Sequence, residues 1–128
     1  MRLLLDTHAF LWFVLGDPRL VQTARDAILD PAQAKLVSPA SYWEIAIKIS
    51  LGKYTLTEPY EVFMHSGIFG NGFSVLPVEL THTAVLTTLP FHHRDPFDRL
   101  LVAQSLAEQI PVLSADATLD VYGITRLW

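Results

Sequence analysis

Hydrophobic and polar positions follow one another along the chain in short blocks that predict strands separated by helices. Five short apolar runs are typical of buried strands, and they lie at 2–5, 35–38, 73–78, 110–116 and 124–128. Apolar spacing and helix-start signals between these runs predict helices at 8–15, 18–28, 39–52, 57–70, 80–89 and 96–109. Strands that alternate with helices favour right-handed βαβ units. We therefore predict an α/β fold with a central parallel sheet of about five strands, covered on both faces.

Three pairs of residues are typical of the start of a helix. In each pair, a short polar side chain that can cap the first turn is followed by proline, which suits the first helical position. The pairs are Asp17–Pro18, Ser38–Pro39 and Asp95–Pro96.

Four acidic residues are expected to share one edge of the sheet. Asp6 follows the first strand and Asp116 ends the fourth, so in a parallel sheet both lie at its carboxyl edge. Glu44 lies near the start of the helix after the second strand, and Asp98 lies in the first turn of the helix before the fourth. Asp98 reaches the same edge if the helix at 96–109 runs antiparallel to the strand that follows it. Ligands of such sheets bind beyond this edge, which makes a shared pocket the candidate site.

Each acid also has a plainer structural interpretation, which the sequence leaves open. Asp6 could simply end a strand, and Asp116 could cap the turn after one. Glu44 could pair with Lys48 one helical turn away, a contact worth a few tenths of a kcal/mol. The helix of Glu44 is apolar nearly all round, however, and a buried carboxylate needs a partner or a cation.

A divalent cation would relieve the repulsion within such a group of acids. Clustered carboxylates raise one another's pKa, and a bound cation removes that cost. The chain has no cysteine, so oxygen ligands and a hard cation, Mg²⁺ or Mn²⁺, are expected. Asp95 is explained as a helix cap, whereas the helix N-terminus favours the ionised Asp98 that a cation also requires. A site of this kind can activate water for an in-line phosphoryl displacement.

Composition and motifs narrow the classes of protein and of site that the chain could represent. With 51% hydrophobic and 17% charged residues, the chain of 128 residues suits a single domain, 1–128, with one core. The net charge of −4 argues against a protein that coats nucleic acid by bulk charge. The five histidines show no metal-ligand spacing, and His92 and His93 are interpreted as part of a solvated loop. We find no glycine-rich phosphate loop and no nucleophile elbow.

The apolar start of the chain is not interpreted as a signal peptide. Asp6 and His8 interrupt the apolar run, and no small-residue cleavage site follows. The run after His8 is also too short to span a bilayer. We expect a soluble, cytoplasmic protein without a membrane partner.

The chain as a whole resembles the PIN-domain family and, within it, the VapC-like toxins of toxin–antitoxin pairs. Four segments carry the resemblance in the family's order, and they are "LLLDTHAFLW", "SPASYWEIAIKISLGK", "HHRDPFDRLLVAQS" and "VLSAD". The third segment matches the subgroup that contains "DPFDR". The resemblance implies a three-layer α/β/α sandwich and an endoribonuclease that uses Mg²⁺ or Mn²⁺ and leaves a 5′-phosphate and a 3′-hydroxyl.

The resemblance also implies roles for individual residues. The positions that match the family's four acids, expected to be catalytic and to hold the metal, are Asp6, Glu44, Asp98 and Asp116. Asp95 is an additional acid of the subgroup, expected to assist through water. Thr7 and Ser114 match small hydroxyl positions beside the metal. Lys48 and Arg99 match basic positions near the cleft, where they would meet phosphate or orient a carboxylate.

The implied partners are RNA as the substrate, a second copy of the chain in a homodimer, and a small antitoxin that lays a peptide across the site. The antitoxin carries the DNA-binding part in this family, so this chain is not expected to bind operator DNA itself. The aromatic stretch from Phe10 to Phe13 could supply a groove for the antitoxin or belong to the core.

Two alternative functions stay open. One is a haloacid-dehalogenase-like phosphatase, although His8 replaces its usual second aspartate, and the other is a non-catalytic PIN-like binding module.

Overall fold

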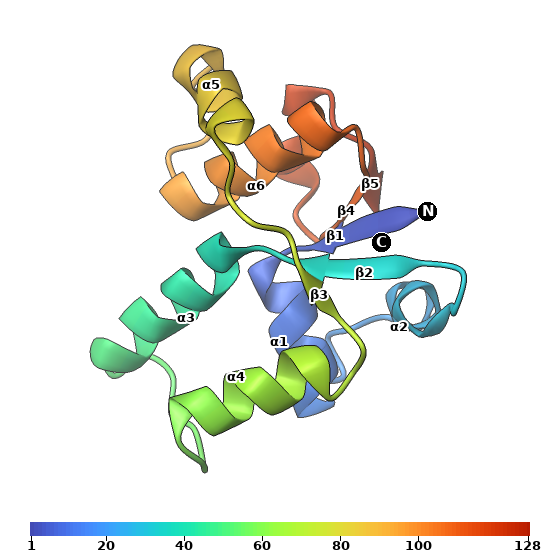
Figure 1. Ribbon diagram of the computed structural model, residues 1–128, viewed down its shortest axis with the longest axis vertical. Helices are drawn as coiled ribbons and strands as arrows, with labels where there is room; N and C mark the ends of the chain where they lie inside the picture. The colour runs from blue at the N-terminus through green and yellow to red at the C-terminus, as the bar shows by residue number, and fades with distance from the viewer.

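The computed structural model describes residues 1–128, which form a central sheet with helices on both sides (Figure 1). The strands are β1 (Arg2–Leu5), β2 (Ala34–Val37), β3 (Ser74–Val75), β4 (Val112–Leu113) and β5 (Arg126–Leu127). The helices are α1 (Thr7–Leu15), α2 (Gln22–Leu29), α3 (Pro39–Ser50), α4 (Tyr60–Phe69), α5 (Leu80–Thr88), α6 (Pro96–Glu108) and the 3₁₀ helix η1 (Ala117–Tyr122). None of these helices combines the length and the apolar character needed to cross a membrane.

All five strands are parallel and follow the order β3-β2-β1-β4-β5, which confirms the predicted fold class. β1 lies at the centre and pairs on both sides, with Leu5 opposite Val37 of β2 and Leu113 of β4. The other three strands have only two residues each, fewer than their apolar runs predicted. Leu76 and Ile110 lie outside the strands and are still buried. The apolar runs therefore predicted correctly which residues are buried, but only part of each run is paired with a neighbouring strand.

The alternation of side chains along β1 divides the core between the two faces of the sheet. Leu3 and Leu5 point to the face covered by α1, α2 and α4. Leu4 points to the opposite face, where it packs against Leu101 of α6. Figure 1 shows α5 and α6 on that side, so the helices and the sheet form the expected three layers.

Two of the three predicted helix starts are correct, and one is wrong. Ser38 accepts a hydrogen bond from the backbone of Ala40 and caps α3, and Asp95 caps α6 in the same way. Asp17 instead closes the end of α1, because its N–H donates to the carbonyl oxygen of Trp12 after a left-handed Gly16. The helix expected from Pro18 therefore begins only at residue 22.

Phe10 provides a test of the larger core. The ring is fully buried under the sheet and packs 6.1 Å from the ring of Phe73. We expect Phe10→Ala to lower the free energy of unfolding by about 3–5 kcal/mol, because the change removes apolar contacts and leaves a cavity. Leu15→Ala, at a position of the same helix that is 58% exposed, should change it by less than about 0.5 kcal/mol. Urea unfolding of both variants measures the difference, and equal effects would contradict the described core.

Candidate active site

The candidate site lies at the carboxyl edge of β1. Because Leu5 pairs with Leu113, the residues that follow, Asp6 and Ser114, are neighbours at this edge. The N–H of Asp6 donates to the carbonyl oxygen of Leu113 at 3.1 Å and continues the ladder by one bond. The Asp6 carboxylate then accepts a hydrogen bond from the backbone of Ala9 at 2.8 Å and caps α1. Asp6 thus ends the strand and starts the helix, and its side chain is buried where the two meet.

Burial raises the pKa of the Asp6 carboxyl. Hydrogen bonds from the Ser114 side chain and the Ala9 backbone lower it in part, and the charge of Glu44 raises it further. A carboxylate in this position is ionised at lower cost when a positive charge lies beside it.

Glu44 lies in the first half of α3 and has a partner on each carboxylate oxygen. The Thr7 hydroxyl donates to Oε1 at 2.7 Å, and the Lys48 ammonium lies 3.1 Å from Oε2. The Ser41 hydroxyl lies a further 3.0 Å from that of Thr7. The pair with Lys48 that the sequence suggested is therefore present, and the same contacts fix the orientation of this buried carboxylate within electrostatic reach of Asp6.

Asp98 differs from the other acids because its carboxylate accepts no hydrogen bond. It lies in the first turn of α6, and burial raises its pKa from 3.8 to about 7. The charges of four neighbouring carboxylates add to the rise, in the order Asp95, Glu44, Asp6 and Asp116. The predicted acids thus lie in one electrostatic environment, in which the charges of the others raise the pKa of Asp98.

Asp116 lies beyond β4 rather than inside the strand, which ends at Leu113. Its Oδ1 accepts hydrogen bonds from the Thr118 backbone at 3.0 Å and the Thr118 hydroxyl at 2.6 Å, so it caps η1. Burial acts to raise the pKa of Asp116, but the hydrogen bonds from Thr118 and the nearby His93 together outweigh it and lower the pKa. Asp116 therefore caps the turn after the strand, and its Oδ2 still points towards the site, 3.6 Å from His93 Nε2.

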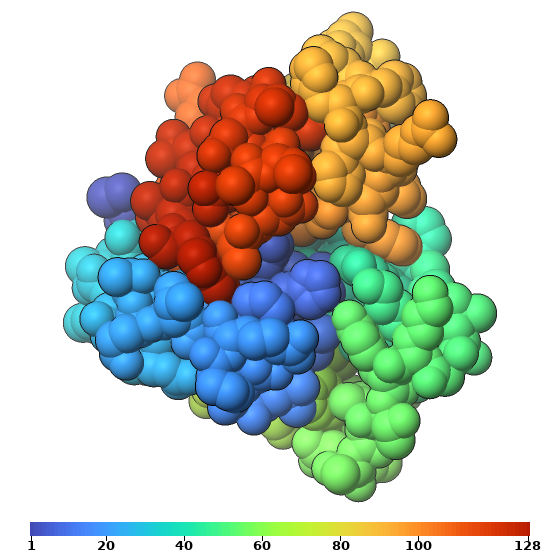
Figure 2. Space-filling model, turned by 180° about the vertical axis from the view of Figure 1, so that it is seen from behind, coloured from blue at the N-terminus to red at the C-terminus, as the bar shows by residue number.

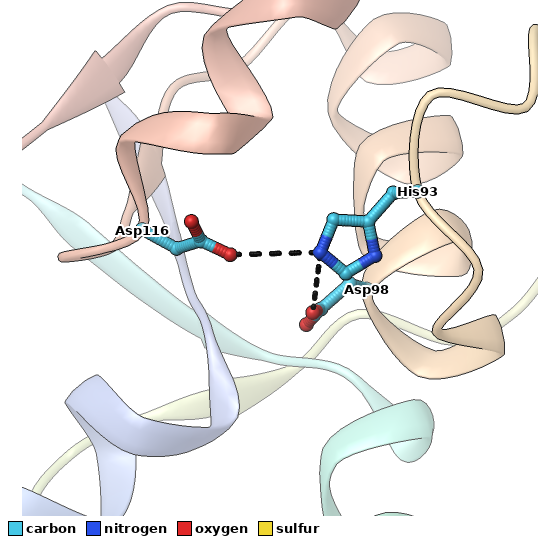
Figure 3. A group of neighbouring side chains, drawn as sticks. All are labelled: His93, Asp98 and Asp116. Atoms are coloured by element: carbon cyan, nitrogen blue, oxygen red, sulfur yellow. Dashed lines mark ion pairs between the residues drawn. The ribbon is translucent and has the colours of Figure 1, made fainter.

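His93 is the member of the site that the sequence interpretation missed. Its Nε2 lies 3.7 Å from Asp98 Oδ2 and 3.6 Å from Asp116 Oδ2, between acids from two separate segments (Figure 3). Both histidines lie in the loop before α6, as predicted, but only His92 is exposed, and the His93 side chain is mostly buried beside the acids. The available signal was its position two residues before the helix cap Asp95, close to the first turn that carries Asp98.

The cap of α6 links His93 to Asp98. Asp95 Oδ1 accepts hydrogen bonds from the backbone of Phe97 at 2.8 Å and of Asp98 at 3.1 Å, as predicted for a cap. The backbone N–H of Asp95 itself donates to His93 Nδ1 at 3.3 Å. In a capping box, that N–H would be bonded to the side chain of the third helical residue, here Asp98. Because His93 takes this bond, the carboxylate of Asp98 remains free.

Arg99 does not point to the acids, which corrects the predicted position near the cleft. Its buried guanidinium donates to the carbonyl oxygens of Pro90 at 2.8 Å and Leu89 at 3.2 Å. It also lies 4.0 Å from the ring centre of Phe91. The guanidinium therefore anchors the segment before α6, which carries His93, from inside the protein.

The segments that carry these residues meet on one face of the molecule (Figure 2). In that view the blue start of the chain lies between the green α3, the orange segment that leads into α6 and the red segment after β4. Asp98 and the Oδ2 atom of Asp116 have the carboxylate oxygens that remain free, and Asp6 and Glu44 are held close by. Oxygen atoms of this kind suit a hard divalent cation.

A groove with a volume of about 310 Å³ runs along α1 beside the site. The residues that line it include His8, Leu11, Trp12, Arg19, Lys53 and Tyr54. Phe10, in contrast, belongs to the core, so the aromatic stretch that starts there divides between core and groove.

Comparisons with known proteins extend over nearly the whole chain. The sequence profile of the PIN domain matches residues 3–124. VapBC2 from Rickettsia felis, solved with a promoter DNA fragment, has a TM-score of 0.75 at 11% identity and covers 99% of this chain and 98% of that chain. VapBC-1 from nontypeable Haemophilus influenzae has a TM-score of 0.69 at 16% identity, with 99% and 97% covered. FitAcB from Neisseria gonorrhoeae has a TM-score of 0.65 at 12% identity, with 98% and 96% covered. The search of curated proteins gave no match.

The raised pKa of Asp98 predicts how stability depends on pH. The carboxyl has a pKa near 3.8 in the unfolded chain and about 7 in the folded one, so the folded state binds the extra proton between these values. The wild type should therefore lose stability as the pH rises from about 4 to about 7. Asp98→Asn removes this loss, and without metal the variant should be more stable than the wild type at pH 8 by about 2 kcal/mol after solvent screening.

Urea unfolding in EDTA at pH 4.5 and pH 8 measures this difference. Asp26→Asn changes an exposed acid on α2 and serves as the control. The gain of Asp98→Asn should be clearly larger at pH 8 than at pH 4.5, and an equal gain at both would reject the assignment of the raised pKa to Asp98.

Proposed function

The chain belongs to the PIN-domain family, and from this premise we propose that it is a metal-dependent endoribonuclease and the toxin of a toxin–antitoxin pair. The observation that carries the proposal is the state of Asp98. Its carboxylate is partly buried, accepts no hydrogen bond and has a pKa of about 7 among neighbouring acids. An acid that serves only the fold would have a donor, whereas a metal ligand gains its partner when the cation binds.

The oxygen ligands that the site offers fit Mg²⁺ or Mn²⁺. The residues that would hold the ion are Asp6, Glu44, Asp98 and Asp116, all through oxygen atoms. When bound, the ion supplies an activated water and stabilises charge in an in-line displacement that leaves a 5′-phosphate and a 3′-hydroxyl.

The other polar residues orient this group. The Ser114 side chain forms a hydrogen bond with Asp6. Thr7 donates to one carboxylate oxygen of Glu44, and Lys48 is paired with the other. Lys48 also offsets one negative charge of the cluster. Asp95 orders the first turn of α6, from which Asp98 projects. We assign Arg99 to the loop before α6 and not to contact with phosphate.

We propose three partners for this function. RNA would enter at the carboxyl edge of the sheet, in front of the acids. A small antitoxin would lay a peptide into the groove along α1, whose apolar wall with Arg19 and Lys53 beside it suits a chain with apolar and acidic side chains. A second copy would pack near α3, where Trp43 is 62% exposed and lies edge-on against Phe97. Operator binding is assigned to the antitoxin, since this chain has a net charge of −4.

The two alternatives have less support. A haloacid-dehalogenase-like phosphatase needs a second carboxylate two residues after Asp6, and that residue is His8, whose ring stacks 5.5 Å from that of Trp12. A non-catalytic binding module would have no need for an acid in the state of Asp98.

The proposal predicts metal-dependent cleavage of RNA. Purified protein, freed of small partners, is mixed with total cellular RNA in Mn²⁺, in Mg²⁺ and in EDTA. We expect discrete fragments with 5′-phosphate ends in the metals and none in EDTA. Asp6→Asn and Asp98→Asn should each reduce the rate by at least about 100-fold, because each removes one negative charge from the metal ligands. Asp26→Asn should cleave like the wild type.

The variants must be folded for the result to count, which circular dichroism and thermal unfolding establish. Cleavage at the wild-type rate by both folded variants would refute the assignment of the site. Absence of cleavage together with absence of metal binding in calorimetry would favour the binding module. A phospho-aspartate trapped at Asp6 would favour the phosphatase.

A further inference from the structure

We propose that His93 is a substrate-binding residue, whose Nε2–H donates a hydrogen bond to a phosphate oxygen at the acidic site. The inference rests on the proposed ribonuclease function and adds to the acids a residue that recognises the anion to be cleaved. It follows from the hydrogen bonds of the imidazole, from the positions of the nearby cationic groups and from the anchoring of the loop.

The hydrogen bonds of His93 determine which ring nitrogen carries the proton. Asp95 N–H donates to Nδ1 at 3.3 Å, so Nδ1 is an acceptor and Nε2 carries the hydrogen of the neutral ring. Nε2 then has no lone pair to offer a metal ion, although it lies in a cluster with Asp98 and Asp116 that could hold one. The imidazole is therefore a donor within the site and not a fifth ligand.

This donor is only weakly used by the protein. Its distances of 3.7 Å to Asp98 and 3.6 Å to Asp116 exceed those of a good hydrogen bond. A cation held by those carboxylate oxygens would leave the N–H without its two weak acceptors. A group that approaches both a cation and an N–H there must offer anionic oxygen atoms, and phosphate does so.

Two of the cationic side chains that lie close to the acids in sequence, Lys48 and Arg99, are committed to other contacts, whereas Arg94 is exposed. The Lys48 ammonium is paired with Glu44, and the Arg99 guanidinium is bonded to carbonyl oxygens of the loop. His93 differs from these cationic groups because its Nε2 lies between the free carboxylate oxygens of Asp98 and Asp116 (Figure 3).

The imidazole is also held in place before any ligand arrives. Its side chain is 23% exposed, and a turn of the ring would break the bond from the Asp95 backbone. The preceding residues are fixed by Arg99, which lies against Phe91 and bonds to Pro90. A preorganised donor loses little freedom when it binds phosphate.

The first test observes the nitrogen atoms directly. Nitrogen-15 spectra of the imidazoles in the wild-type protein should show Nδ1 of His93 unprotonated and Nε2 protonated. Addition of inorganic phosphate in the presence of Mg²⁺ should shift the Nε2 signal of His93 and leave that of His92 unchanged. A proton on Nδ1, or no shift with phosphate, would overturn the proposal.

The second test separates the donor from the structural bond. His93→Asn keeps an acceptor near the Nδ1 position and loses the donor, whereas His93→Gln keeps a donor near the Nε2 position. We expect His93→Asn to raise KM for RNA by about 10- to 100-fold with wild-type thermal stability. His93→Gln should retain most of kcat/KM with lower stability. His92→Asn is the matched control and should behave as the wild type.

Metal binding, measured by calorimetry with Mn²⁺, should change by less than about threefold in these variants, because the imidazole is not a ligand and lies beyond good hydrogen-bond distance of both carboxylates. A tenfold loss of Mn²⁺ affinity, or a wild-type KM in His93→Asn, would overturn the proposal. If the wild type cleaves no RNA, the proposed function fails, and the phosphate titration of the imidazole still decides the role of His93.

Discussion

The parallel pairing of β1 between β2 and β4 is the constraint on which the site depends. The ladder aligns Leu5 with the last residues of both neighbours, so the chain leaves the sheet at three adjacent points. The residues there, Asp6, Ser38 and Ser114, have short polar side chains, and the first two cap the helices that follow. The unpaired N–H groups at the start of a helix need acceptors, and this need places polar side chains at the same edge of the sheet where the acids lie. A register slip of one residue in β1 would turn Leu4 to the wrong face and remove Asp6 from this edge.

The acids differ in how the fold compensates them. Glu44 has a hydroxyl and an ammonium, and Asp116 has two donors from Thr118. Asp98 has none, and its raised pKa reflects the free energy that the fold loses by keeping this carboxylate partly buried among other charges. Proteins retain such locally destabilising groups where a bound ligand restores the lost stability. The contrast between Asp98 and its neighbours is thus more informative than the number of acids.

The sequence predicted those parts of the molecule that local chemistry determines. The cap-and-proline signals at Ser38 and Asp95 located two helix starts, and strand ends located Asp6. The same signal failed at Asp17, because its backbone serves the end of α1, a choice that depends on the left-handed Gly16 before it. The positions of His93 and Arg99 were missed for a different reason. Both depend on how the loop before α6 folds against the start of that helix, and residue spacing carries no information about that path.

The state of Asp98 has a consequence for the stoichiometry of ion uptake. Near pH 7 about half of the metal-free molecules carry a proton on this carboxyl, and a cation that uses its oxygens must displace it. Loading therefore releases protons into the buffer, and the apparent affinity falls by about tenfold for each pH unit below 7. The heat of loading will then depend on the ionisation enthalpy of the buffer. A modest fall in pH would therefore release the cation from the acidic site without any change in the concentration of the ion.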